Sequence, residues 1–346
     1  MQKNIVWLCP GFAANESDSQ CIPPLQLLAK ALEESKAVRL QIVALHYPFR
    51  SKPYIWNNIS VYPCHHRGLA SRWRIWSKAF RVLKDLQQQQ KIDGLHSFWL
   101  TDAAFIGHWA SRYLSCPHWV TLAGQDAKRS NRYLHFLPFQ QMNTIALSSF
   151  HAKVWKASTG QSPKHLIPWG IESLAETTSS EDRPIDIIGV GNLIELKDYL
   201  LFVELIAELL IKRPNLKALI IGDGTERPML QKLIDEKGLA NNLQLAGALP
   251  RQEVMKYMQQ SKVFFHPSTY ESFGFVLLEA MTNGLHIVSR PVGIAQKSDQ
   301  WWIGNNFTEL KEGLEEALLQ FNEPKPRNPY PLATTLQSYL TIYQQS

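Results

Sequence analysis

The segment that decides the fold is His266-Pro-Ser-Thr-Tyr-Glu-Ser-Phe-Gly-Phe-Val-Leu-Leu-Glu279. It follows a short apolar run, Val263-Phe-Phe, whose length and composition are typical of a buried strand. Gly274 then precedes Phe275-Val-Leu-Leu-Glu-Ala-Met, which is typical of the start of a helix. A strand, a polar loop and a helix in this order favour an open α/β sheet, in which ligands bind at the carboxyl ends of the strands.

The two carboxylates of this segment, Glu271 and Glu279, are spaced to hold the two ends of a long ligand. If all eight steps between them were helical, the rise would be about 12 Å. Paired glycosidase carboxylates lie closer, roughly 5–9.5 Å apart across one bond. A carboxylate accepts several hydrogen bonds and therefore suits vicinal hydroxyls, such as those of a sugar or a ribose. The spacing alone is equally compatible with an ordinary loop glutamate and a solvated helix glutamate.

Composition predicts a globular protein of two domains. The chain has 346 residues, of which 45% are hydrophobic and 19% charged. No apolar run approaches the roughly 18 residues of a membrane span, and Pro10-Gly11 interrupts the first run too early for a signal peptide. We therefore expect a cytoplasmic protein. The four cysteines are scattered, so buried free thiols are expected rather than a metal or redox site.

Charge is distributed unevenly along the chain. Residues 1–175 carry 20 Lys and Arg against 9 Asp and Glu, whereas residues 176–346 carry 16 against 21, which together give the net charge of +6. A basic first half indicates an anionic partner, such as a membrane surface or a phosphorylated lipid. Nucleic acid is a disfavoured partner, because the cations are spread out and match no known reader module.

A basic amphipathic helix is predicted from Ser71 to Leu86. Its residues Trp73, Trp76, Phe80 and Leu83 share one stripe, with cations elsewhere on its surface. Such a stripe can face the core of its own domain or lie on an anionic membrane surface, and the first interpretation is favoured because tryptophan stripes are more often core.

The pair Glu271-x7-Glu279, flanked by His-Pro-Ser and Phe-Gly, resembles the E-x7-E motif of retaining GT-B glycosyltransferases of family 4. Three further segments of the second half resemble the donor-binding loops of that family. They are Val-Gly191-Asn192 with Lys197, Gly222-Asp223-Gly224 and the strand ending at Gly247. Asn192 stands where the family has Arg, so one positive charge is absent. A dinucleotide-binding G-x-G-x-x-G interpretation of the first segment is weak, because Ile194 replaces the third Gly.

The first half resembles the family less closely. Gly11 follows the first strand, and His96 is predicted to follow the strand that begins near Ile92. Thr-Leu-Ala123-Gly124-Gln-Asp126 is similar to the family loop Thr-x-His-Gly-x-Asp, with Ala123 in place of the His. The resemblance implies that Gly11, His96, Gly124 and Asp126 lie on the acceptor side.

The resemblance implies a GT-B fold, with two Rossmann-like domains facing each other across a cleft. Residues 1–172 form the acceptor domain, 173–183 a linker, and 184–327 the nucleotide-sugar domain. Residues 328–346 form a C-terminal helix that crosses back to the first domain.

The implied activity is transfer of a hexose from a nucleotide-diphosphate sugar to a saccharide or lipid-linked acceptor in polysaccharide or lipopolysaccharide synthesis. The anomeric configuration is expected to be retained, and neither a cofactor nor a metal is expected. Catalytic roles fall to Glu271 and Lys197. The donor-binding set is Gly191, Asn192, Lys197, Gly222, Asp223, Gly224, Gly247, His266, Glu271, Ser272, Phe273, Gly274, Phe275 and Glu279.

Two alternatives remain open. The first is an isomerase on the same scaffold, which the loss of a His at Ala123 does not favour. The second is a catalytically silent protein that binds a sugar nucleotide or a protein partner, which the departures at Ala123 and Asn192 favour.

Overall fold

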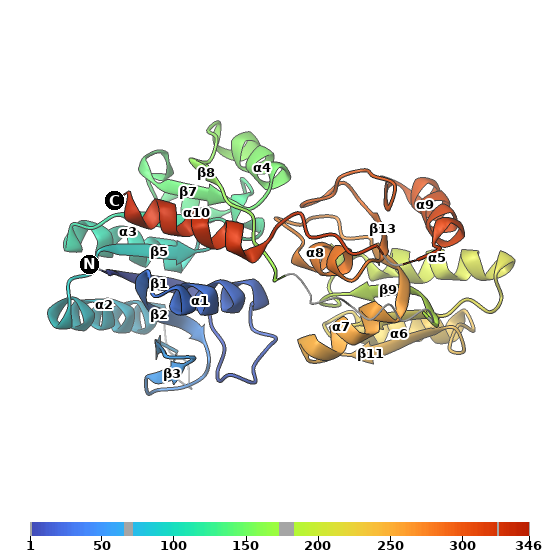
Figure 1. Ribbon diagram of the computed structural model, residues 1–346, viewed down its shortest axis with the longest axis horizontal. Helices are drawn as coiled ribbons and strands as arrows, with labels where there is room; N and C mark the ends of the chain where they lie inside the picture. Colours follow the sequence, from blue (N-terminus) through green and yellow to red (C-terminus); the bar gives the residue numbers. More distant parts are fainter. Residues whose placement is uncertain (1, 66–71, 173–182, 324, 346) are drawn as a thin grey trace. The chain divides into compact units, whose positions relative to one another are not determined.

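The computed structural model describes residues 2–65, 72–172, 183–323 and 325–345. The chain forms two compact units, one made of Met1–Glu172 with Tyr330–Ser346 and the other of Ser173–Pro329 (Figure 1). Each unit is built on a largely parallel sheet covered by helices, which confirms the predicted two-domain α/β class. Within the described residues, no helix combines the length and apolar character needed to cross a bilayer.

The first unit contains an eight-stranded sheet in the order β3-β4-β2-β1-β5-β6-β7-β8. Its strands are β1 (Lys3–Gly11), β2 (Val38–Tyr47), β3 (Tyr54–Trp56), β4 (Ile59–Pro63), β5 (Gly94–Phe98), β6 (His118–Thr121), β7 (Asn143–Ala146) and β8 (His165–Leu166). Its helices are α1 (Pro23–Ser35), α2 (Arg72–Gln89), α3 (Asp102–Leu114), α4 (Ser149–Thr159) and α10 (Leu332–Gln344).

The two faces of this sheet are covered by different helices. Side chains alternate between faces along a strand, so Trp7 and its neighbours Val6 and Leu8 point to opposite sides. Val6 and Leu8 share a core with α2 and α3, whereas the indole of Trp7 bonds Tyr343 of α10. Helix α10 also packs beside α1, as Figure 1 shows for the red end of the chain. The last helix therefore completes the core of the first unit.

Helix α2 buries a face that overlaps only in part with the predicted stripe. Ile75, Ala79, Leu83 and Leu86 face the core, whereas Trp73 lies at the surface with 72% of its area exposed. Trp76 and Phe80 are partly buried and pack against the same core, so the core-facing interpretation is right for Leu83, right in part for Trp76 and Phe80, and wrong for Trp73.

The second unit contains a six-stranded parallel sheet in the order β11-β10-β9-β12-β13-β14. The strands are β9 (Ile185–Val190), β10 (Ala218–Ile221), β11 (Leu243–Gly247), β12 (Ser261–His266), β13 (His286–Ser289) and β14 (Trp301–Ile303). The helices are α5 (Tyr199–Lys212), α6 (Arg227–Glu236), α7 (Arg251–Gln259), α8 (Phe275–Thr282) and α9 (Phe307–Gln320).

The order of these strands reverses between β9 and β12. The chain builds outward from β9 to β11 and then returns to the other side of β9, where Val263 of β12 pairs with Ile187. In open α/β sheets the loops at such a reversal leave a crevice at the carboxyl ends of the strands, which is where ligands bind. This edge of the second sheet is therefore the place to look for a site.

The predicted linker, 173–183, lies outside the described residues except at Arg183. The guanidinium of Arg183 is buried and donates to the carbonyls of Met258 and Asn283. Arg183 is thus anchored in the second unit, and the boundary lies at least one residue earlier than predicted.

Candidate donor site at the strand reversal

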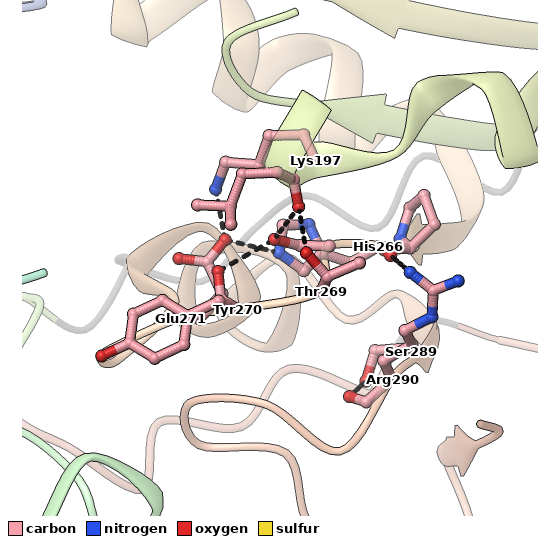
Figure 2. A network of polar contacts seen from close by, with 10 residues as sticks. Lys197, His266, Thr269, Tyr270, Glu271, Ser289 and Arg290 are labelled. Carbon is pink, nitrogen blue, oxygen red and sulfur yellow. Dashed lines mark hydrogen bonds and ion pairs between the residues drawn. The ribbon is translucent and has the colours of Figure 1, made fainter. Parts of the chain in front are cut away.

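Lys197 and Glu271 come together at the reversal because each follows one of its two central strands. Lys197 ends the short 3-10 turn Glu195–Lys197 after β9, and Glu271 lies in the loop between β12 and α8. The Nζ of Lys197 donates to Oε1 of Glu271 (Figure 2). The imidazole of His266, the last residue of β12, lies 2.8 Å from the same oxygen. The structure thus brings together three residues that sequence reasoning assigned to one site.

Electrostatics keep Glu271 ionised. Burial alone would raise its pKa, but the charge of Lys197 and the hydrogen bond from His266 outweigh burial and lower the pKa to about 2. Burial lowers the pKa of His266 despite its carboxylate partner, so the ring is neutral near pH 7. A neutral imidazole beside a carboxylate must carry its proton on Nε2 to donate there.

The turn that carries Lys197 is fixed against the loop that carries Glu271. The carbonyl of Leu196 accepts hydrogen bonds from the backbone N–H of Thr269, at 2.9 Å, and from the hydroxyl of Ser268, at 3.2 Å. Ser268 is fully buried, so its bond is shielded from water. Figure 2 shows these contacts beside the lysine and carboxylate. The ion pair is therefore a consequence of two loops already held in register.

Glu279 has a separate cationic partner. It lies in the middle of α8, only 7% exposed, and its Oε1 is 2.7 Å from Nε of Arg251 at the start of α7. The Arg251 guanidinium also lies 5.9 Å from the ring centre of Phe275. Burial raises the pKa of Glu279, and Arg251 opposes that rise. A buried carboxylate held by one arginine keeps acceptor capacity for hydroxyl groups.

The predicted glycines pack the loops of neighbouring strands against one another. A Cβ on Gly222 would lie 1.9 Å from the carbonyl oxygen of Gly191, and one on Gly224 would lie 2.3 Å from that of Leu193. The N–H of Gly222 also donates to the carbonyl of Gly247. These positions therefore require glycine because the backbones after β9, β10 and β11 touch.

The other predicted donor residues differ in their accessibility. Asn192 and Asp223 are exposed at the rim, where Oδ1 of Asp223 accepts the N–H of Gly224. Ser272 and Phe273 are buried, and the Phe273 side chain is fully so. Phe273 can therefore meet a ligand only through its backbone. Gly274 has a positive φ and immediately precedes α8, whose first residue, Phe275, is half-buried.

In the first unit, Asp126 organises the loop after β6. Its carboxylate accepts the backbone N–H groups of Leu100, at 2.7 Å, and Gly124, also at 2.7 Å, and is itself buried. The carbonyl of Gly124 in turn lies 3.1 Å from Nε2 of His151, a buried residue of α4 whose pKa is lowered by burial. Asp126 therefore stabilises the backbone of this loop. Ala123, in the same loop, is buried.

His96 does not lie in a loop, which corrects the prediction. It is the middle residue of β5 and has no exposed surface. Its Nδ1 lies 2.6 Å from the hydroxyl of Tyr343, and its Nε2 lies 2.8 Å from Oγ1 of Thr121. A histidine covered in this way by α10 cannot touch an acceptor. Gly11 is also buried, with Tyr47 beside its Cα.

Two charged residues of the second unit were missed by sequence reasoning. Arg251 is 28 positions from Glu279, so no local spacing could reveal the pair. Arg290, just after β13, donates to the carbonyl of Pro267 and pairs with Asp198 at 2.8 Å. Asp198 has a left-handed backbone, with φ of 52°.

Among the described residues, no group of three or more His, Cys, Asp or Glu is arranged to hold a metal ion.

The part of the chain that carries this cluster matches a known family. Residues 171–320 match the family described as Glycosyl transferases group 1. The matched segment contains Lys197, Glu271 and Glu279, so the second unit has the sequence pattern of that family.

Two curated relatives match a similar part of the chain. One component of the human phosphatidylinositol N-acetylglucosaminyltransferase is 28% identical over 169 residues, 47% of this chain and 35% of that protein. The alpha-D-kanosaminyltransferase of Streptomyces kanamyceticus is 32% identical over 124 residues, 36% of this chain and 32% of that protein. The chain thus spans about a third of the length of these relatives.

A solved structure extends the likeness to both units. Anabaena HepE, in complex with UDP and glucose, superposes with a TM-score of 0.72 at 16% identity and covers 99% of each chain. At this identity the match concerns the fold, which is that of the GT-B glycosyltransferases, as predicted.

Proposed function

We propose that this protein is a retaining glycosyltransferase that moves a hexose from a nucleotide-diphosphate sugar to a saccharide or lipid-linked acceptor. The observation that carries the proposal is the Lys197–Glu271–His266 cluster at the strand reversal. The family match over 171–320 supports it, because that segment supplies the whole cluster. The relatives that carry N-acetylglucosaminyl and kanosaminyl names support a sugar donor.

Lys197 is assigned to the departing diphosphate. Transfer breaks the bond between the anomeric carbon and the diphosphate oxygen, so negative charge grows on the leaving group. The Lys197 ammonium is fixed beside Glu271 and only 17% exposed, a setting in which its charge is screened less than in water. Helix α8 begins at Phe275, shortly after Glu271 in the same loop, so the positive end of its dipole lies at the same edge.

The two glutamates are assigned to hydroxyl groups at opposite ends of the donor. Glu271 stays ionised down to about pH 2 and so accepts hydrogen bonds from sugar hydroxyls throughout the physiological range. Glu279, held by Arg251, is assigned to the ribose. We propose that no metal is needed, since Lys197 and backbone amides supply the positive charge. The site of action is proposed to be the cytoplasm, in the synthesis of cell-surface polysaccharide or lipopolysaccharide.

Nucleotide release from a panel of nucleotide sugars, measured with and without saccharide and lipid-linked acceptors, tests this proposal. Lys197→Ala and Glu271→Gln are each expected to lower turnover by about a hundredfold or more. Lys212→Ala and Glu315→Gln are matched controls, because they break an exposed pair of the same chemistry, 3.1 Å apart. Turnover unchanged in both site variants would contradict the mechanism, and a chelator that stops the wild type would contradict metal independence.

A catalytically silent binding protein is the second candidate, and two substitutions favour it. Ala123 is buried where the family has a His, and Asn192 replaces an Arg at the rim of the donor site. Calorimetric binding of a nucleotide sugar, with no release on any acceptor, would identify such a protein. For such a protein, Lys197→Ala would weaken nucleotide-sugar binding, and neither the wild type nor the variant would show turnover.

A further inference from the structure

A run of aromatic side chains follows the outer seam between α2 and α3 in the first unit. Trp73 and Trp76 of α2 have ring centres 5.2 Å apart, and Trp76 lies 4.6 Å from Phe105 of α3. Phe105 in turn lies 6.4 Å from Trp109. The contact between Trp76 and Phe105 therefore joins the aromatic side chains of α2 to those of α3.

Much of this aromatic surface is open to solvent. Trp73 and Tyr113 are each 72% exposed, and Trp109 is 49% exposed. The core face of α2 is a different stripe, made by Ile75, Ala79, Leu83 and Leu86. The exposed rings thus do not complete the fold of their own unit, and clustered exposed aromatics mark an interaction surface.

A pocket of about 490 Å³ lies farther along the same seam. Phe80, Tyr113 and Leu114 line it with apolar surface, and Arg81 and Lys84 of α2 also border it. It is therefore a hydrophobic hollow bordered by two cations.

Positive charge is concentrated on α2 itself. The helix carries Arg72, Arg74, Lys78, Arg81 and Lys84 against the single acid Asp85. On α3 the acid Asp102 is buried and bonded to His46, whereas Arg112 is exposed. The α2–α3 face thus combines exposed tryptophan and tyrosine with an excess of cations.

We propose that the α2–α3 face docks on the surface of an anionic phospholipid bilayer, with an acyl chain entering the pocket beside Tyr113. Tryptophan and tyrosine prefer the boundary between headgroups and acyl chains, and nearby Lys and Arg attract acidic headgroups. A second copy of this chain is a poorer occupant, because two α2 helices of this charge would repel each other. The surface lies wholly within the first unit and does not depend on the donor chemistry of the second.

Vesicle flotation with the full chain tests this docking surface. Vesicles of phosphatidylcholine alone are compared with vesicles in which half of the lipid is phosphatidylglycerol. The wild type is expected to float with the anionic vesicles and to be released at high salt. Arg81→Gln with Lys84→Gln is expected to weaken the partition about tenfold or more. Trp73→Ser with Tyr113→Ser is expected to weaken it by a similar factor at any salt concentration.

Matched control variants distinguish an effect of this surface from a general effect of charge or hydrophobicity on vesicle binding. Lys153→Gln with Lys156→Gln removes two exposed cations at the same spacing on α4, and Phe136→Ser removes a ring that is 64% exposed. Both controls are expected to float like the wild type. The proposal is overturned if the wild type ignores anionic vesicles, if controls and α2–α3 variants weaken equally, or if sedimentation shows a dimer that Trp73→Ser with Tyr113→Ser dissociates.

Discussion

The Nε of Arg251 lies 2.7 Å from Oε1 of Glu279, so a largely buried charged pair joins the start of α7 to the middle of α8 in the second unit. Removing one partner of such a pair leaves the other buried without compensation, which costs more than an exposed pair would. In the function that we propose, Arg251 positions Glu279 and so acts on the donor through it.

Replacing Arg251 by Gln is expected to weaken nucleotide binding about tenfold near neutral pH. Burial already raises the pKa of Glu279, and loss of the arginine charge raises that pKa further. A larger fraction of Glu279 is then protonated and loses acceptor capacity, so affinity should recover as pH increases. Calorimetric titration with nucleoside diphosphates at several pH values measures this shift. Lys256→Gln, an exposed change on the same helix, should leave the pH profile unchanged.

A second expectation concerns acid stability of the second unit. The pKa of Glu271 is lowered to about 2 in the folded chain, so its ionised form stabilises the fold above its ordinary pKa. That contribution, on the order of 3 kcal/mol, is lost as pH falls from about 4.5 towards 2. The protection of β12 amides from hydrogen exchange, relative to the intrinsic exchange rate at each pH, should therefore fall over this window in the wild type and much less in Glu271→Gln. An equal acid response in both proteins would show that Glu271 is not held ionised.

The sequence was sufficient to predict that Lys197 and Glu271 lie together, because the determinants of that cluster are local. Lys197 and Glu271 each follow a strand within a few residues, and glycines mark the loops whose backbones touch. Arg251 and Arg290 could not be predicted, because their partners are set by which strands become neighbours in the sheet. His96 was misplaced for a related reason, since its strand begins two residues after Ile92 and α10, far away in the chain, covers it.

Tyr343→Phe is expected to lower the free energy of unfolding of the first unit by about 1–3 kcal/mol. The Tyr343 hydroxyl contacts two buried groups, Nε1 of Trp7 at 3.0 Å and Nδ1 of His96 at 2.6 Å. Without the hydroxyl, Nε1 of Trp7 and Nδ1 of His96 remain buried, each with one hydrogen-bond partner fewer. Urea unfolding followed by tryptophan fluorescence measures the change, since nine of the 11 tryptophans lie in this unit. Tyr113→Phe, at an exposed ring, should have no measurable effect.

Gly222→Ala is expected to destabilise the second unit far more than Gly238→Ala, although both glycines have a positive φ, at 148° and 68°. An added Cβ at Gly238 meets nothing within 4 Å, so only the backbone cost of about 1–2 kcal/mol applies. At Gly222 the same carbon lies 1.9 Å from the carbonyl oxygen of Gly191, which forces the loops after β9 and β10 apart. Because the β9 loop leads into the turn that carries Lys197, nucleotide affinity should fall together with stability in Gly222→Ala alone. Equal losses in the two variants, measured by thermal unfolding and calorimetric titration, would show that the contact between the loops does not position the site.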